Sequence, residues 1–402
     1  MTTLWYSMPA SQKGMSKRRR TILATCICIC LSFWLFWNIS SFDIALSGVG
    51  VISKAVLPSC KHSADPDTLF ILRTGVTEIA DRIPAHISTS LQCSTQHVIF
   101  SDYAETFLGE RVLDALELVD PDIVANNSDF ELYRRVKEHG RAVLSQSELS
   151  GNLSQAPSGT GHTEIPGWKL DKWKFVPMVN RTFYEYPDMK WYIFAEGDTS
   201  ILWSTLQAYL AGMDHTKPHY LGSATNIGDD PAFAYGGAGF IVSQPAMRMI
   251  ADYYSDHKAE IETITQKSWA GDAVLGKVLF NARVPVKDVW PLVHGASTSQ
   301  ALFARPYSPG VPKEAEQVWC YPAASLHHMS STAIDSLWHY EQQWLEQRVN
   351  VSRPKFGILF HLSMHASNAL FAEHGAYPPQ RYLHGPCDAA NDRCTDRLGQ
   401  SQ

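Results

Sequence analysis

The sequence predicts an α/β fold, a sheet with parallel strands flanked by helices, and two stretches of the chain carry this prediction. In the first, a buried strand over residues 67–75 precedes a helical pattern over residues 79–91, interrupted near Pro84, and a second strand over residues 97–100. A strand, a helix and a strand in this order predict a right-handed crossover between parallel strands. In the second, the aromatic and apolar run over residues 191–195 is typical of a fully buried strand.

Size, composition and charge are those of a large globular protein. The chain has 402 residues, 12 of them tryptophan, and a formal net charge of −6, which leaves room for one large domain or two ordinary ones. The acidic balance does not support a nucleic-acid binder, so we expect no nucleic acid among the partners. The sequence has neither G-x-G-x-x-G nor G-x-x-x-x-G-K-S/T, so dinucleotide binding and P-loop hydrolysis have no support.

The N-terminal region predicts a membrane anchor. A polar tail over residues 1–20 ends in four basic residues, and residues 21–42 contain no charged side chain. This apolar stretch is long enough to cross a lipid bilayer, and the basic residues before it predict a cytosolic N-terminus. A cleaved signal peptide is the alternative, but the long lead and the bulky Trp34 and Trp37 favour an uncleaved anchor. We expect a stem over residues 43–66 and a lumenal chain beyond it.

Glycosylation sequons and cysteines agree with a lumenal chain. Beyond the predicted anchor, N-x-S/T triplets occur at four positions, Asn126, Asn152, Asn180 and Asn350. Five cysteines follow the anchor without a C-x-x-C pair, which argues against a zinc ribbon. We expect the disulfides Cys60–Cys93 and Cys387–Cys394, which leave Cys320 unpaired.

The sequence Glu196-Gly197-Asp198 places two carboxylates where the buried strand at residues 191–195 ends. Ligands bind off the carboxyl ends of strands in open α/β sheets, and clustered carboxylates bind hard divalent cations. A metal that holds a diphosphate is one interpretation. The other is that both acids favour the N-terminus of the next helix, which Thr199 or Ser200 would cap and Gly212 would end.

The same reasoning gathers further residues at this edge of the sheet. Arg73 and Thr74 end the first strand and Asp102 follows the second, so all three are expected where a nucleotide would lie. Gly75 follows Thr74 directly.

The middle of the chain is predicted to be helical with one surface insert. Residues 111–143 have a mostly solvated helical pattern, and residues 144–167 are rich in Ser, Gly, Asn and Pro, which is typical of a mobile insert. Residues 168–175 predict a helix packed by its aromatic side chains. Lys172 or Lys174 could contact a phosphate, although solvated lysines are more common.

Three later motifs have both a structural and a functional interpretation. Gly236 and Gly237 belong to a glycine-rich turn, which allows either a close approach to a bound group or simply a tight turn. Asp272 begins an apolar helical run as an N-cap or as a general base. His327 and His328 are core or surface histidines unless Asp198 already binds a metal.

Seven segments together, in order, resemble the Fringe-like family 31 glycosyltransferases, and most closely a fungal branch. These segments are LFILRTG, HVIFSD, GWKLDKWKF, WYIFAEGDT, YGGAGFIVS, GDAVLG and SLHHM. The resemblance implies a Rossmann-like mixed sheet of GT-A type over residues 67–345, followed by an extension over residues 346–402. It also implies a single-pass type II protein of the Golgi membrane that transfers sugar from a UDP-sugar to a glycan or glycoprotein acceptor, usually in β-1,3 linkage.

The resemblance also implies roles for individual residues. Asp198 would bind Mn²⁺ together with His327, with His328 as the alternative ligand, and Asp272 would be the catalytic base. The remaining matched residues would bind the donor, namely Arg73, Thr74, Gly75, Asp102, Glu196, Gly197, Gly236 and Gly237. Two glycines depart from the usual family motifs. Gly197 occupies the middle position of the acidic motif, and Gly271 replaces the acid that usually precedes the base.

Three functions are therefore in competition. A metal-dependent inverting glycosyltransferase is favoured because Asp198, Asp272 and His327 occur together. An inactive lumenal relative that binds glycans or assists a partner is the main alternative, and Gly197 and Gly271 favour it. A nucleotide-sugar hydrolase is the third, since the same site could direct water instead of an acceptor.

Overall fold

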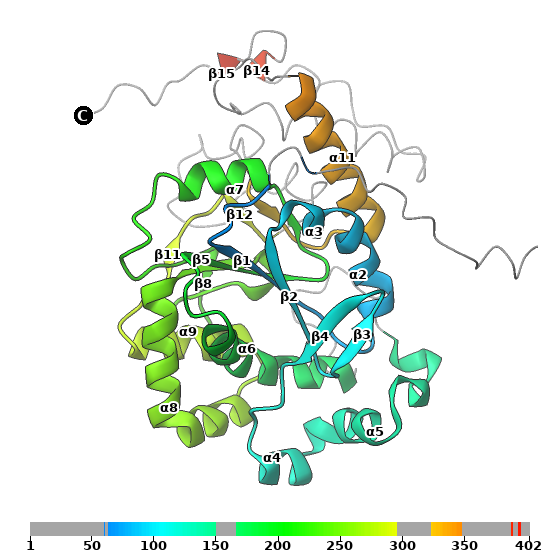
Figure 1. The fold of residues 1–402 in the computed structure, drawn as a ribbon. Coiled ribbons are helices and arrows are strands. Elements are labelled where there is room, and N and C mark those ends of the chain that lie inside the picture. The colour runs from blue at the N-terminus through cyan, green and yellow to red at the C-terminus, as the bar shows by residue number, and fades with distance from the viewer. Residues whose placement is uncertain are drawn as a thin grey trace, which may run out of the picture. The chain divides into compact units, whose positions relative to one another are not determined.

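The computed structural model describes residues 60, 63–149, 166–295, 323–347, 387–388 and 393–394 (Figure 1). The chain divides into two compact units, residues 1–57 and 58–402, and every described residue belongs to the second. The predicted tail, the anchor at residues 21–42 and most of the stem, insert and C-terminal extension lie outside the described residues. In the ranges given above, no helix is both long and apolar enough to cross a membrane.

The described chain is built on a mixed eight-stranded sheet in the order β11-β7-β10-β5-β1-β2-β4-β3 (Figure 1). Neighbouring strands are parallel in the pairs β1–β2, β1–β5, β2–β4 and β7–β11, and antiparallel in β5–β10, β7–β10 and β3–β4. The strands are β1 (Thr68–Arg73), β2 (Gln96–Ser101), β3 (Glu105–Phe107), β4 (Glu110–Asp114), β5 (Trp191–Glu196), β7 (Tyr220–Gly222), β10 (Phe240–Ser243) and β11 (Lys287–Asp288). The predicted mixed α/β sheet is confirmed.

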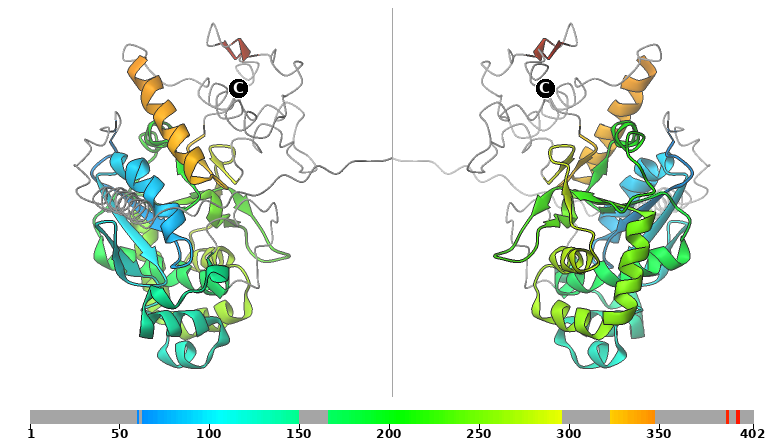
Figure 2. Two further views of the ribbon diagram at one scale, coloured as in Figure 1. Left: turned by 90° about the vertical axis from the view of Figure 1, so that its right-hand side faces the viewer. Right: turned by 90° about the vertical axis from the view of Figure 1, so that its left-hand side faces the viewer.

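Helices cover both faces of this sheet. Leu69 and Ile71 of β1 pack in one buried cluster with helices α6, α8 and α9, whereas Phe70 and Leu72 pack in another with α2, α7 and α11. Successive side chains of a strand point to opposite faces, so this alternation gives a layer of helices on each side (Figure 2). The helices are α2 (Ile79–Ser88), α6 (Pro166–Glu185), α7 (Trp203–Leu210), α8 (Gln244–Lys267), α9 (Gly271–Asn281) and α11 (Ser331–Gln347).

The register of the three central strands brings their carboxyl ends together. Arg73, the last residue of β1, lies opposite both Glu196 of β5 and Phe100 of β2. Residues that follow these strands therefore meet at one edge of the sheet, as the predicted parallel crossover requires.

A second sheet of three short strands lies next to the end of β5. It has the order β12-β13-β6, with β12 at Val293–His294, β13 at Ser325–Leu326 and β6 at Ser200–Ile201. The antiparallel pairing of β6 with β13 places Ser200 opposite Leu326. This pairing brings the residue that follows Leu326 close to Asp198.

Two predicted elements are wrong in detail. Pro84 lies inside α2 and does not interrupt it, since Ile79 and Ile83 are buried against the sheet and this packing offsets the cost of a proline inside a helix. The predicted solvated helical stretch at residues 111–143 begins in strand β4, because Val112 and Leu113 pair with β2 and are buried. Its helices are α4 (Pro121–Asn126) and α5 (Glu131–His139), and α3 (Ser90–Cys93) follows α2.

The predicted disulfide Cys60–Cys93 is confirmed. In the hairpin of β14 (Cys387–Asp388) and β15 (Arg393–Cys394), Cys387 lies opposite Cys394, and a disulfide between them stays a prediction. Cys320 lies outside the described residues. A further pair of short strands, β8 (Ala224–Thr225) and β9 (Phe233–Ala234), completes the fold.

Candidate active site

The acidic motif lies in the loop between β5 and β6, and its neighbour Thr199 does not cap a helix. The Thr199 hydroxyl donates a hydrogen bond to the Gly237 carbonyl over 2.7 Å and accepts one from the Glu196 N–H over 3.2 Å. Ser200 is in β6, and α7 begins only at Trp203. The predicted capping role of Thr199 or Ser200 is therefore wrong, because Thr199 bonds Glu196 and Gly237 and Ser200 pairs with β13.

Asp198 contacts the two histidines that follow β13. Its Oδ1 lies 3.2 Å from Nε2 of His327, and its Oδ2 lies 4.0 Å from Nδ1 of His328. The three residues can offer ligand atoms that all lie within 4.8 Å of one another. A carboxylate and imidazoles so placed could hold a divalent cation.

Charges in this group stabilise one another. Burial would raise the pKa of Asp198, but the neighbouring imidazole of His327 and the guanidinium of Arg82 hold it below its usual value. Burial would lower the pKa of His327, but Asp198 raises it above its usual value. Burial and the neighbouring His327 lower the pKa of His328. The Asp198 side chain therefore remains a carboxylate, the form that binds a cation.

A single turn, η5 (Gly236–Ala238), connects this group to Asp272. The N–H of Gly236 donates a 2.9 Å hydrogen bond to Oδ2 of Asp272. The next residue, Gly237, lies against His327, because a Cβ added there would be 2.2 Å from Cε1 of that ring. Two adjacent glycines thus have Asp272 and His327 as direct neighbours.

Asp272 lies in the first turn of α9, and the N-cap position belongs to Ala270. The prediction that Asp272 caps this helix is therefore wrong. Its carboxylate accepts hydrogen bonds from the N–H groups of Gly236 and Ala273, both over 2.9 Å. Burial raises the pKa of Asp272, although these two N–H groups oppose the shift. A carboxylate with a raised pKa is a better proton acceptor than an exposed one.

Gly271, next to Asp272, is required by packing. A Cβ at this position would lie 2.4 Å from Cδ2 of Phe175 and 2.6 Å from Cα of Lys172. Helix α9 therefore approaches α6 so closely that an acid at position 271 has no room.

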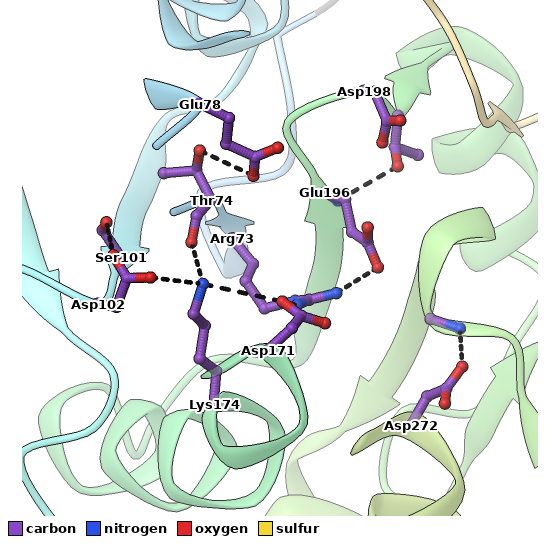
Figure 3. A network of polar contacts seen from close by, with 12 residues as sticks. Arg73, Thr74, Glu78, Ser101, Asp102, Asp171, Lys174, Glu196, Asp198 and Asp272 are labelled. Atoms are coloured by element: carbon purple, nitrogen blue, oxygen red, sulfur yellow. Dashed lines mark hydrogen bonds and ion pairs between the residues drawn. The ribbon is translucent and has the colours of Figure 1, made fainter. Parts of the chain in front are cut away.

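A network of ion pairs joins the acidic motif to the other predicted donor residues (Figure 3). Arg73 forms ion pairs with Glu196 and with Asp171 of α6, and its guanidinium lies 4.0 Å from the centre of the Phe175 ring. Burial raises the pKa of Glu196 to about 7, although Arg73 opposes the shift. Arg73 therefore links β1 to the end of β5.

Lys174 is the centre of the second half of this network, so the prediction of a solvated lysine is wrong. Its buried ammonium donates a 3.0 Å hydrogen bond to the Thr74 carbonyl and lies 3.3 Å from Oδ2 of Asp102 and 3.8 Å from Asp171 (Figure 3). A Cβ on Gly75 would be 3.2 Å from this ammonium. The helix α6 thus brings a cation to the edge of the sheet where Thr74, Gly75 and Asp102 lie.

Two buried residues of α2 support the acidic motif and were not predicted. The guanidinium of Arg82 donates to the Met329 carbonyl over 3.2 Å, and Nε2 of His86 lies 3.0 Å from the Gly197 carbonyl. Burial lowers the pKa of His86 to about 4, so its neutral ring donates to Gly197. Their spacing of four residues places both on one helix face, which was the available signal in the sequence.

The structure thus brings all the predicted site residues to one end of the sheet. The η5 turn contains Gly236 and Gly237 and lies between Asp272 and the pair Asp198 and His327. Arg73 and Glu196 connect this group to the residues around Lys174. Their roles in binding and catalysis stay predictions.

Comparison with known proteins supports a family assignment. A comparison with curated proteins finds no match. The model of the family described as Fringe-like matches residues 66–301, more than half of the chain. His327 and His328 follow the matched stretch, but the pairing of β13 with β6 joins them to it. The chain therefore belongs to the Fringe-like family of glycosyltransferases.

Proposed function

We propose that this protein is a metal-dependent, inverting glycosyltransferase of GT-A type. It transfers a sugar from a UDP-sugar to a hydroxyl group of a glycan or glycoprotein, in the β-1,3 linkage that the resemblance implies. One observation carries the proposal: the turn at Gly236 and Gly237 contacts the carboxylate of Asp272 through one residue and the imidazole of His327 through the next. A base and a cation ligand so close together suit a displacement at the carbon that joins sugar to diphosphate.

Asp198 and His327 fit the role of cation ligands. They present a carboxylate, which suits Mn²⁺, and an imidazole, which binds transition-metal ions, and Oδ1 of Asp198 already lies 3.2 Å from Nε2 of His327. When bound, Mn²⁺ would supply a Lewis acid that stabilises negative charge on the departing UDP.

Asp272 would accept the proton of the acceptor hydroxyl. As the hydroxyl oxygen forms a bond to the anomeric carbon, the bond from that carbon to the diphosphate oxygen breaks and UDP leaves with the electron pair. The proton goes to the carboxylate of Asp272, and attack opposite the leaving group inverts the anomeric centre. The two backbone donors to Asp272 orient the carboxylate for this transfer.

Eight residues would form the donor side of the site, namely Arg73, Thr74, Gly75, Asp102, Glu196, Gly197, Gly236 and Gly237. Glu196 and Arg73 form an ion pair. This pair would orient the loop without adding net charge to the donor side. The absence of an acid at Gly271 favours an inactive relative only weakly, because packing against Phe175 and Lys172 explains it.

We further propose that residues 21–42 anchor the protein in the Golgi membrane, with residues 67–345 as the lumenal catalytic domain and residues 346–402 as an extension. The family resemblance and the basic residues before the apolar stretch support this arrangement.

The test is UDP release by the purified full-length protein across a panel of UDP-sugars with Mn²⁺, with and without glycan acceptors. We expect release that a chelator abolishes and that fails in Asp198→Ala and in Asp272→Asn. Asp252→Asn, on the exposed surface of α8, is the matched control and should retain full activity.

Two results would contradict the proposal. A folded protein that binds glycans but releases no UDP from any donor would be the inactive relative. Free sugar in place of a glycoside, with release that survives Asp272→Asn but not Asp198→Ala, would indicate a hydrolase.

A further inference from the structure

The residue after His327 directs its imidazole to the same carboxylate. Nδ1 of His328 lies 4.0 Å from Oδ2 of Asp198, while His327 contacts the other oxygen, Oδ1. Asp198 therefore has one imidazole near each of its two oxygens. In the part of the chain that the structure describes, these three residues are the only group of three or more His, Cys, Asp or Glu placed to share a cation.

This arrangement depends on an unusual backbone conformation. In an extended chain, two successive side chains point to opposite sides. His328 instead has a φ of 55°, in the left-handed region, and its ring centre lies 3.8 Å from that of His327. A residue with a Cβ atom adopts this conformation at a cost in free energy, and such strain collects at ligand sites.

The residues on both sides of His328 are held in place. His327 packs against Gly237, and the N–H of Met329 donates a 2.9 Å hydrogen bond to the Asp198 carbonyl. Arg82 donates to the carbonyl of Met329. The left-handed turn is thus stabilised from neighbouring elements, and it keeps the His328 ring beside Asp198.

We propose that His328 is a third protein ligand to the cation, so that the centre has one carboxylate and two imidazoles. This inference rests on the metal site of the proposed function. Imidazole nitrogen suits ions such as Co²⁺ and Zn²⁺, whereas Mg²⁺ and Ca²⁺ prefer oxygen ligands. The two imidazoles therefore favour a transition-metal ion, Mn²⁺ in the proposed reaction with Co²⁺ and Zn²⁺ as probes of the same site, and His328 discriminates against Mg²⁺.

The experiment measures metal binding by the full-length protein after removal of metal with a chelator. Co²⁺ is titrated and followed by its visible absorption, Zn²⁺ by competition with Co²⁺, and Mg²⁺ by calorimetry. His328→Gly removes the imidazole and favours the left-handed backbone, so it keeps the fold. His139→Ala, an exposed histidine of α5, is the matched control.

We expect His328→Gly to raise the Kd for Co²⁺ and Zn²⁺ by at least the roughly tenfold that loss of a hydrogen-bond partner of a metal ligand costs, and to change the Co²⁺ absorption spectrum. The Kd for Mg²⁺ should change less than about twofold, and the unfolding temperature without metal should stay the same or rise. Asparagine tolerates the same backbone conformation and offers an amide oxygen. The Kd of His328→Asn for Co²⁺ should therefore lie between those of the unmodified protein and His328→Gly.

Different failures have different meanings. If Asp198→Ala and His327→Ala lose Co²⁺ but His328→Gly binds it like the unmodified protein, the third ligand is wrong and the proposed metal site stands. If His328→Gly leaves the metal Kd unchanged and weakens UDP binding, His328 contacts the diphosphate and the inference is overturned. If the unmodified protein binds no cation, the proposed function fails together with this inference.

Discussion

A Cβ atom added to Gly237 would lie 2.2 Å from Cε1 of His327, so these two residues fit together only because position 237 has no side chain. His327 is buried and has Tyr235 on another side, with ring centres 5.4 Å apart. Both neighbours therefore hold the ring beside Asp198.

Gly237→Ala should displace the imidazole of His327 and weaken metal binding. We expect the Kd for Mn²⁺ to rise about tenfold or more, measured by loss of the free Mn²⁺ paramagnetic resonance signal. Gly212→Ala is the control, because a Cβ there meets only the Tyr209 carbonyl at 3.5 Å. Equal Mn²⁺ affinity in both variants would contradict the role of this contact.

Lys174→Met should destabilise the fold strongly. The substitution leaves the buried carboxylate of Asp102 without its cation, and breaking a buried ion pair in this way costs about 3–5 kcal/mol. Urea unfolding at neutral pH measures the loss. The exposed Lys169 provides the control, since Lys169→Met should change the free energy of unfolding by less than about 0.5 kcal/mol.

The double variant Lys174→Met/Asp102→Asn tests the cause of that loss. It should be more stable than Lys174→Met alone, because the unpaired charge is gone. If the double variant is equally unstable, the lost packing of the lysine stem explains the effect instead.

Gly271→Glu, which introduces the acid usual in the family motif, should destabilise the protein and fail to increase its activity. The new side chain would meet Phe175 and the backbone of Lys172, and overpacking of this kind costs about 3 kcal/mol. Thermal unfolding and UDP release measure both effects. A stable variant with higher activity would instead mean that the glycine had reduced catalysis.

Glu341 should make the stability of the protein depend on pH. This buried carboxylate of α11 accepts hydrogen bonds from the N–H and the hydroxyl of Ser204, at the start of α7. Burial raises its pKa from 4.5 to about 6. The folded state therefore binds the proton more tightly, and its contribution to stability is lost as the pH rises from about 4.5 to 6, by about 2 kcal/mol in total.

Glu341→Gln should remove this dependence and keep an acceptor for Ser204. We expect the difference in free energy of unfolding between pH 4 and pH 7 to change by about 2 kcal/mol between the two proteins, measured by urea unfolding at both values. Parallel pH profiles would mean that Glu341 titrates normally in the folded protein.

The residues at the edge of the sheet could be predicted from the sequence, because the carboxyl ends of neighbouring parallel strands lie at the same edge. Arg73, Asp102 and Glu196 each end or follow a buried strand, and the register brings them together as expected. The contact between Asp198 and His327, and the position of Asp272 on the neighbouring η5 turn, followed from the family resemblance, since no local pattern joins residues so far apart in the chain.

The rest depended on tertiary contacts that a local pattern does not contain. Lys174 resembles any solvated lysine until Asp102 and Thr74 surround it. Strand β4 has a helical pattern in the sequence, yet its pairing with β2 decides its conformation. The hydrogen bond from Arg82 to the Met329 carbonyl could not be predicted, because it depends on a contact between α2 and the loop before α11.

The pairing of β6 with β13 determines when the site can exist during protein synthesis. Asp198 leaves the ribosome early, but β13, and with it His327 and His328, follows only after the stretch matched by the family model has been completed. A nascent chain that stops at residue 301 would therefore contain Asp272 and the acidic loop but neither of the two histidines proposed to bind the cation. Premature termination or cleavage in this region would yield a product that contains all eight strands of the main sheet but lacks the proposed metal centre.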